Sequence, residues 1–277
     1  GTSLGTFAYR VNNTAVTELN LLGNAGLVRT VGDSYGIILL PESATGSDIE
    51  EARKLLIDRG AADSSANVDD FWRTRSDIVE FNFIDTSNAT SFVGAWRECS
   101  SLLSFPSIDA SSGVYFNNAW RGCSALTSFP AGAKLGTEAN NVNFTSAWQQ
   151  SGLTSFPALD LSTGNSFHNA FNGCSALTSF PSGAKLGTAA TNVNFTDAWR
   201  DSGLQSFPAL DLSAGGTLRR SWFYTPLVSF GAIDASNTTN FSSAWQGTGA
   251  LTSFPADALL GTEATNVNFQ DAWRSTG

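Results

Sequence analysis

The 277-residue chain lacks methionine, has a single histidine, and has few charged residues, which make up 14% of it. Because no start residue is visible, we expect the chain to be processed or part of a longer protein. Its net charge of −9 argues against nucleic acids and anionic membrane surfaces, since phosphate groups are bound by basic faces. No apolar run approaches the roughly 20 residues of a membrane span. We therefore expect neither a nucleic-acid partner nor a membrane span in this chain.

The scarcity of histidine also limits the catalytic chemistry that can be proposed. His168 stands alone, and the chain has no GxSxG motif and no glycine-rich phosphate loop. Cleavage of a polysaccharide requires a pair of carboxylates in one groove, and no acidic residue is distinguished from its counterparts elsewhere in the chain. The sequence thus favours a protein that is not an enzyme and has no cofactor, with a glycan-active enzyme as the weaker alternative.

The three cysteines, Cys99, Cys123 and Cys174, each lie three residues after an aromatic residue. Serine or threonine takes the matching position elsewhere. A position that accepts cysteine, serine and threonine requires a small, weakly polar group, so we expect free thiols in a packed row. A Cys99–Cys123 disulfide and a metal site are the alternatives, although three cysteines without histidine partners do not make a zinc site.

An internal repeat dominates the rest of the chain. The octapeptide CSALTSFP occurs at Cys123–Pro130 and at Cys174–Pro181, and looser copies of FxxAW followed by LxSFP recur every 23 to 28 residues. The leading apolar residues of these copies are Val68, Phe92, Phe116, Phe144, Phe167, Phe195, Leu218, Phe241 and Phe269. A unit of this length cannot bury its own apolar side, whereas stacked units share a continuous core. The repeat therefore predicts a solenoid.

Each half of the unit predicts a local structure. Phe116, Ala119 and Trp120 are spaced i, i+3 and i+4, which is one face of a helical turn. LTSFP is short and rich in β-forming and hydroxyl residues, which is typical of a strand that ends at proline. We expect a right-handed leucine-rich-repeat coil stack with one parallel β-sheet, and with short helical or 3₁₀ turns on the other side.

The stretches AFNGCSALTSFP and AWRGCSALTSFP resemble the repeat unit of the BspA-like leucine-rich repeat family of surface proteins. The resemblance extends over residues 68–277, with tryptophan replacing the usual phenylalanine in most copies. It implies extracellular display and a role in adhesion or recognition. Similar arrays are found in fibre and appendage proteins of bacteriophages, although fold alone does not determine function.

Two regions are expected. Residues 1–67 lack the repeat, and we interpret them as a small α+β N-terminal cap or joining segment with short strands and one helix at 47–59. Ser47 and Glu50 form a capping box for that helix and Gly60 ends it. Residues 68–277 form the solenoid of about eight coils. Its last coil, NFQDAWRSTG, stops where the next LxSFP strand is due.

Three repeated positions are candidates for binding. The tryptophans of FxxAW are expected in the core, with partial exposure and a binding role as the alternative. The residue that follows is often arginine, as at Arg97, Arg121 and Arg200, and forms either a solvated, acid-paired row or a contact with an anionic partner. An aspartate in the return loops either caps a turn or binds Ca²⁺, for which oxygen is the usual ligand. The aspartates are Asp85, Asp109, Asp160, Asp211 and Asp234.

The strand LTSFP provides the candidate recognition face. Its outward residues are Thr127, Thr154, Thr178, Gln205 and Thr252. Because adjacent strand residues point to opposite faces, the serine that follows is not expected beside them. Solenoids use such extended surfaces for binding. We therefore predict an adhesion or recognition module on a cell surface or virion, with a protein or glycan receptor as its partner. A structural solenoid that assembles into a homo-oligomer or fibre is the alternative.

Overall fold

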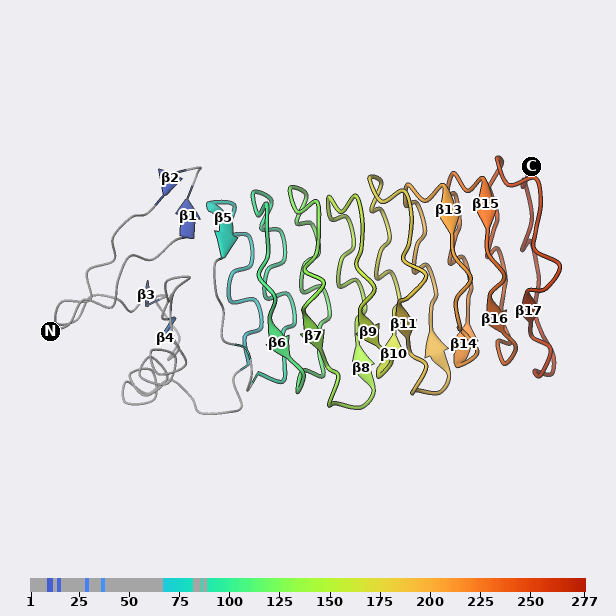
Figure 1. Ribbon diagram of the computed structural model, residues 1–277, viewed down its shortest axis with the longest axis horizontal. Helices are drawn as coiled ribbons and strands as arrows, with labels where there is room; N and C mark the ends of the chain where they lie inside the picture. Colours follow the sequence, from blue (N-terminus) through green and yellow to red (C-terminus); the bar gives the residue numbers. More distant parts are fainter. Residues whose placement is uncertain are drawn as a thin grey trace, which may run out of the picture.

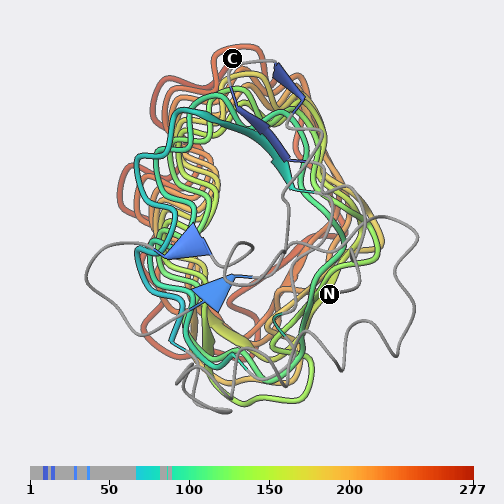
Figure 2. The same ribbon diagram turned by 90° about the vertical axis from the view of Figure 1, so that its left-hand side faces the viewer.

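The computed structural model describes residues 67–81, 86 and 89–277, together with four short strands nearer the N-terminus. From residue 67 onward the described residues wind into a parallel β-solenoid, whose turns lie beside one another in sequence order (Figure 1). Viewed along the stack, the turns superpose around a common outline (Figure 2). The predicted solenoid is thus confirmed. The predicted helix at 47–59 lies outside the described residues, and the role of residues 1–67 as a cap stays a prediction.

The strands are short and parallel throughout the stack. The largest sheet has four strands, in the order β14-β12-β10-β8: Gly215–Thr217, Val193–Asn194, Gly164–Ser166 and Val142–Asn143. Four further parallel pairs are β6–β7 (Asp109–Ala110, Lys134–Leu135), β9–β11 (Asp160–Leu161, Lys185–Leu186), β13–β15 (Ser206–Phe207, Ser229–Phe230) and β16–β17 (Asp234–Ala235, Leu259–Leu260). The structure therefore has several short sheets around each turn instead of the predicted single sheet.

The remaining strands are antiparallel. Strand β1 (Tyr9–Val11) pairs with β2 (Thr14–Ala15) on one side and with β5 (Ile78–Phe81) on the other, and β3 (Val28–Arg29) pairs with β4 (Gly36–Ile37). Since β5 belongs to the first described turn of the solenoid, β1 extends the stack at that end by backbone hydrogen bonds.

The described residues contain no helix, so the prediction of helical turns is not confirmed. We name the segment from the leading residue of FxxAW to the cysteine position, such as 116–123, the turn wall. In 116–123 every second residue donates its N–H to the following turn of the stack, as Trp120 does to the Ala147 oxygen at 2.8 Å. Ala119, Arg121 and Cys123 donate to the carbonyl three residues earlier, as Ala119 does to Phe116 at 3.1 Å. The turn wall thus consists of overlapping β-turns, and backbone hydrogen bonds join it to the same segment of the neighbouring turns of the solenoid.

Two positions of each turn wall adopt a left-handed backbone, which is the conformation that the third residue of a type II turn requires. In 116–123 they are Asn118, with φ 58°, and Gly122, with φ 72°. The other turns keep the same two positions at positive φ: Asp70, Thr74, Gly94, Glu98, Ser146, Gln150, Asn169, Gly173, Asp197, Asp201, Arg220, Tyr224, Ser243, Gly247, Asp271 and Ser275. Glycine, asparagine and aspartate tolerate this conformation best, which explains why they recur there.

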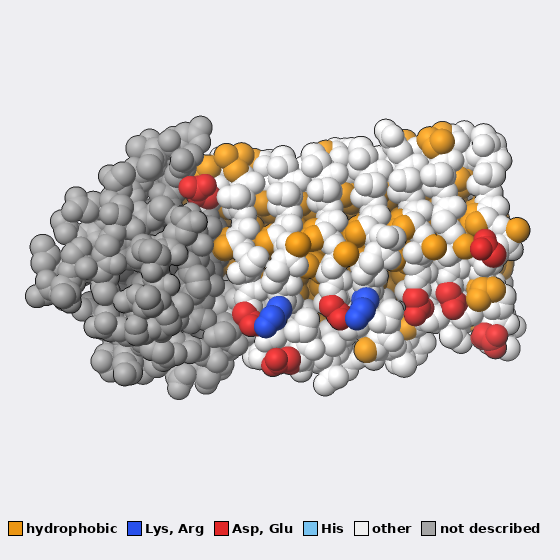
Figure 3. Space-filling view, viewed as in Figure 1, with side chains coloured by type: hydrophobic (Ala, Val, Ile, Leu, Met, Phe, Trp, Pro, Cys, Tyr) orange, Lys and Arg blue, Asp and Glu red, His pale blue; other side chains and the backbone are white. Residues whose placement is uncertain are grey.

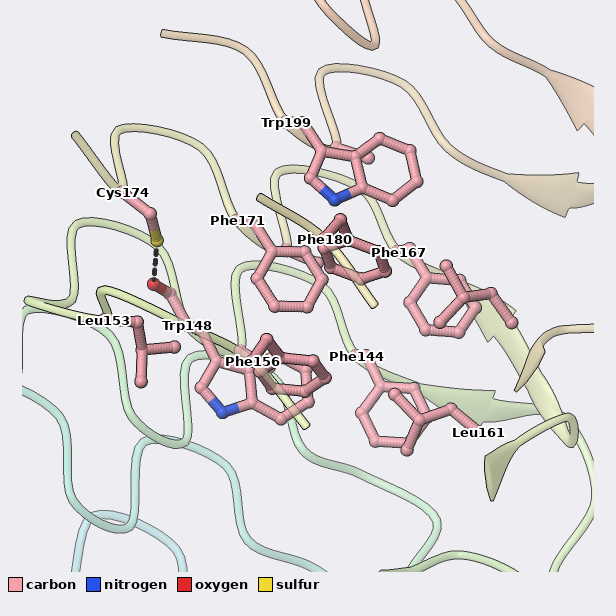
Figure 4. Packing of buried hydrophobic residues seen from close by; sticks show 14 of the residues in the cluster. Phe144, Trp148, Leu153, Phe156, Leu161, Phe167, Phe171, Cys174, Phe180 and Trp199 are labelled. Carbon is pink, nitrogen blue, oxygen red and sulfur yellow. Dashed lines mark hydrogen bonds between the residues drawn. The ribbon is translucent and has the colours of Figure 1, made fainter. Parts of the chain in front are cut away.

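The core consists of stacked aromatic rows, as predicted (Figure 4). The FxxAW aromatic of each turn stacks on that of the next, from Trp72 to Trp273, with ring centroids 5.1–6.3 Å apart. The phenylalanine of LxSFP packs edge-on against this row, as Phe129 does against Trp120 at 4.9 Å and 80°. Six tryptophans between these ends are fully buried, and Trp273 is 41% exposed. Core packing is therefore confirmed for the buried members of the row.

Candidate functional site

The predicted recognition residues Thr127, Thr154, Thr178, Gln205 and Thr252 are all exposed. Each lies between a buried leucine and an outward serine, and the phenylalanine after the serine turns inward. The serines are Ser128, Ser155, Ser179, Ser206 and Ser253. We name these ten residues the hydroxyl face.

The serines correct one prediction. Four of them are exposed and Ser206 is half-buried, so the residue after each threonine or glutamine does not point into the core. From the leucine to the phenylalanine of LxSFP, the side chains are buried, exposed, exposed and buried, whereas the side chains of a regular strand alternate. Among the described turns, regular strands form at this position only in β5, β13 and β15. Both residues of each pair consequently face solvent, and the hydroxyl face is wider than the sequence predicted.

Backbone hydrogen bonds hold neighbouring turns of the hydroxyl face in register. The N–H and the hydroxyl of Thr154 both donate to the Thr127 oxygen, at 2.9 and 3.0 Å. The N–H of Gln205 donates to the Thr178 oxygen at 2.9 Å. In the same row, Leu103 is 51% exposed and Val228 is 58% exposed, so the polar row contains apolar positions. The structure thus presents the predicted residues as a repeated, backbone-fixed row.

A row of charges accompanies the hydroxyl face. Figure 3 shows hydrophobic side chains along the middle of the molecule, with acidic and basic side chains side by side over β6–β7 and β9–β11. Lys134 Nζ lies 3.2 Å from Asp109 Oδ2, and Lys185 Nζ lies 3.1 Å from Asp160 Oδ2. Partial burial alone raises the pKa of the Asp109 carboxyl, but hydrogen bonds from Ser111 and Lys134 outweigh burial, and its pKa falls below the ordinary value.

The repeated aspartates cap turns, as one of the two interpretations predicted. Each accepts a hydrogen bond from the backbone N–H of a serine two residues later, at 3.0–3.2 Å; the aspartates are Asp109, Asp160, Asp211 and Asp234. Asp85 lies outside the described residues. Within the part of the chain that the structure describes, no group of three His, Cys, Asp or Glu side chains lies close enough to hold a metal ion. The Ca²⁺ interpretation thus gains no support from the geometry.

The predicted arginine row lies on a different side of the molecule. Arg97 forms an ion pair with Glu98 at 3.1 Å, Arg200 contacts Asp201 at 3.0 Å, and Arg121 contacts the Asn118 side chain at 3.4 Å. The tryptophan before each of these arginines meets the phenylalanine of LxSFP across the core, so the arginines and the hydroxyl face point in different directions. The structure therefore does not combine the two predicted sets into one site.

Sequence reasoning missed an aromatic pair on the turn wall, Phe223 and Tyr224. Their ring centroids are 4.2 Å apart, Tyr224 is 57% exposed, and the Arg200 guanidinium carbon lies 5.2 Å from the centre of the Phe223 ring. The sequence signal was present: SWFYTP replaces the AWRGC type of segment in this turn alone. Comparing repeated positions does not single out a residue that departs from the repeat.

The cysteines are free and buried, as predicted. Cys174 donates its thiol hydrogen to the Trp148 oxygen of the preceding turn at 3.0 Å (Figure 4), and Cys99 and Cys123 make the matching bonds to Trp72 and Trp96. Burial raises the pKa of Cys99 to about 12 and that of Cys174 to about 11, and it raises the pKa of Cys123 as well. These thiols fill the core and do not offer a thiolate to a substrate.

We expect the folded state to lose stability in alkali because of these thiols. Their pKa values are raised in the folded chain above the unfolded value of about 8.5. The stabilisation is complete below that value and declines as the pH rises from there to the folded values near 11 and 12. The measurement is the free energy of unfolding in urea at several pH values between 7 and 11.

A variant with serine at all three cysteine positions is the control, because Ser151 and Ser202 take this position in other turns. Its stability is expected to depend less steeply on pH over the same range. Equal slopes in the two proteins would contradict the assignment of the decline to the thiols.

Comparisons with protein-family models, with curated proteins and with solved structures found no match for this chain. The resemblance to BspA-like repeats therefore stays a prediction.

The single histidine, His168, is half-buried, with Nδ1 3.1 Å from the Thr196 oxygen and Nε2 3.0 Å from the Asn169 amide nitrogen. Among the described residues no helix is long and apolar enough to cross a membrane.

Proposed function

We propose that this chain is a non-enzymatic recognition module that is displayed on a cell surface or virion, and that presents its hydroxyl face to a protein or glycan receptor. The observation that supports the proposal most directly is the register of the exposed threonines. Thr127 and Thr154 lie on hydrogen-bonded neighbouring turns, as do Thr178 and Gln205. A rigid row of equivalent groups suits a ligand that is contacted over several turns, because weak contacts on one scaffold reinforce one another.

The location rests on the resemblance to BspA-like surface proteins and to bacteriophage appendages, and on the composition of the surface. Charged residues make up only 14% of the chain, and the hydroxyl face carries no charge of its own. A neutral hydroxyl surface recognises partners by hydrogen bonds and shape, with little electrostatic steering. These features support adhesion over recognition of nucleic acids.

The test is binding of the labelled chain to arrays of glycans and of cell-surface receptor ectodomains. Replacing Thr127, Thr154 and Thr178 by lysine is expected to weaken binding at least about tenfold, since bulky charges then interrupt the contact surface. The side chains are exposed, so the fold is expected to remain intact.

Thr137, Thr188 and Thr262 provide a matched control, because they are exposed threonines outside the hydroxyl face. The triple lysine variant at these positions changes residue type and net charge in the same way, and it is expected to bind like the unchanged chain. Equal loss in both variants would contradict a role of the hydroxyl face. Absence of array binding, combined with fibres in light scattering and electron microscopy, would instead support the structural alternative.

A further inference from the structure

The turn that contains Trp222 differs from the others at the two outward positions that follow the tryptophan. These positions hold Phe223 and Tyr224, where other turns hold arginine, glutamine or asparagine followed by a small or polar residue. Tyr224 has φ 55°, in the left-handed region that is unfavourable for residues other than glycine. Gly122, Gly173 and Gly247 avoid this cost at the same position. A bulky aromatic residue therefore occupies a position whose left-handed backbone favours glycine.

The neighbouring turns support the tyrosine ring. A Cβ atom added to Gly247 would overlap the Tyr224 ring, so the ring lies directly over this glycine in the next turn. The ring also contacts Phe223, with centroids 4.2 Å apart and planes inclined by 60°. The guanidinium of Arg200 lies over Phe223 in turn. Tyr224 is thus a supported ring that remains 57% exposed.

A charged pair lies in the turn that precedes this ring. Arg200 Nε lies 3.0 Å from Asp201 Oδ2, and Asp201 occupies the position of Tyr224 in the preceding turn. In the following turn the Gln246 backbone oxygen accepts the Tyr224 backbone N–H at 2.9 Å, which holds Tyr224 in register with that turn. An aromatic ring that is 57% exposed, with a carboxylate and a guanidinium in the adjoining turn, matches a pyranose. The C–H face of the sugar would stack on the ring, and its hydroxyls would bond to the Asp201 carboxylate and the Arg200 guanidinium.

We propose that Tyr224, together with Arg200 and Asp201, binds a pyranose unit of a glycan. This inference rests on the proposed recognition function and adds a second, localised site on the turn wall. A protein partner is less well matched, because an aromatic hot spot in a protein interface is enclosed by contacts that exclude water, and here the ring is 57% exposed beside a charged pair.

Saturation-transfer NMR with a panel of methyl pyranosides of glucose, mannose, galactose, N-acetylglucosamine and glucuronic acid tests the proposal. At least one pyranoside is expected to receive saturation from the unchanged chain. Tyr224→Gly is expected to abolish the signal while raising the melting temperature, because glycine relieves the left-handed backbone. Loss of binding with gain of stability separates a lost contact from a misfolded chain.

Gln150→Gly is the matched control, since Gln150 takes the same left-handed position in another turn, with φ 57°. It is expected to raise the melting temperature in the same way and to keep the pyranoside signal. The proposal is overturned if no pyranoside binds the unchanged chain, or if Tyr224→Gly binds the pyranoside as well as the unchanged chain does. If either result is found while the unchanged chain and Tyr224→Gly bind the arrays equally, only this inference fails. If neither the unchanged chain nor Tyr224→Gly binds the arrays, the proposed recognition function fails too. Loss of a receptor-protein signal alone in Tyr224→Gly would assign the site to a protein.

Discussion

Replacing Trp148 with alanine is expected to lower the free energy of unfolding by about 3–5 kcal/mol, whereas phenylalanine is expected to cost less than about 1.5 kcal/mol. Trp148 is fully buried, and it stacks between Trp120 at 5.5 Å and Phe171 at 5.1 Å. Alanine would leave a cavity in the middle of this row. Because each turn contacts mainly its neighbours, the gap would also separate the two halves of the stack.

Phenylalanine is expected to be tolerated because the indole N–H has no partner to lose. Trp148 Nε1 is buried without a hydrogen-bond partner, as is the indole nitrogen of five other buried tryptophans: Trp96, Trp120, Trp199, Trp222 and Trp245. An unsatisfied buried donor costs about 1–3 kcal/mol, so its removal offsets part of the lost packing. Phe171 already takes this position in the next turn of the native chain.

Urea denaturation followed by far-ultraviolet circular dichroism measures both variants, and Phe171→Trp is the reciprocal control. That variant is expected to be close to neutral, because it adds an unpaired N–H while filling the same row. If Trp148→Phe were as destabilising as Trp148→Ala, the indole would have an interaction that the stacked geometry does not account for.

The stacked core could be predicted from the sequence because position in the repeat determines burial. Phe116, Trp120 and Phe129 recur at matching places in successive units, and a residue type that large and apolar at every repeat has to share one interior. The structure buries all three. This inference required only the register of the repeat, without any knowledge of backbone conformation.

The conformation of the turn wall could not be predicted from apolar spacing alone. Phe116, Ala119 and Trp120 have helical spacing, but consecutive β-turns bring the same three residues to one side. What distinguishes consecutive β-turns from a helix is the pair of residues with a left-handed backbone, Asn118 and Gly122 in this turn. Asparagine and glycine are poor helix formers, and their recurrence was the signal that favoured turns.

The candidate site was predicted in part for a related reason. Exposure of Thr127 and Thr154 followed from their place between buried leucine and phenylalanine. Ser128 and Ser155 were assigned to the wrong face because strand alternation was assumed where the backbone is not a regular strand. Tyr224 was missed because it breaks the repeat, and its exposure depends on a glycine in the following turn.

Gly152→Ala is expected to destabilise the fold by about 3 kcal/mol, the upper end of the range for overpacking. The step Ser151–Leu153 is one residue shorter than Cys123–Leu126 in the preceding turn, so the chain passes closer to that turn. The Gly152 N–H donates to the Cys123 oxygen at 3.1 Å, and an added Cβ would overlap the backbone carbonyl of Ser124. A backbone carbonyl held in a stacked turn cannot move aside as a flexible side chain can.

Gly249→Ala tests whether this effect belongs to the shortened corner. Gly249 is also in the step that follows the turn wall, but it is exposed, and the nearest atom to its added Cβ is the Ser275 oxygen at 4.0 Å. That variant is expected to stay within about 0.5 kcal/mol of the unchanged chain in urea denaturation. Gly203→Ala, which meets the Ser175 carbonyl in the same way as Gly152, is expected to repeat the large loss. Near-equal stability of all three variants would show that neighbouring turns do not approach as closely as their hydrogen-bond register requires.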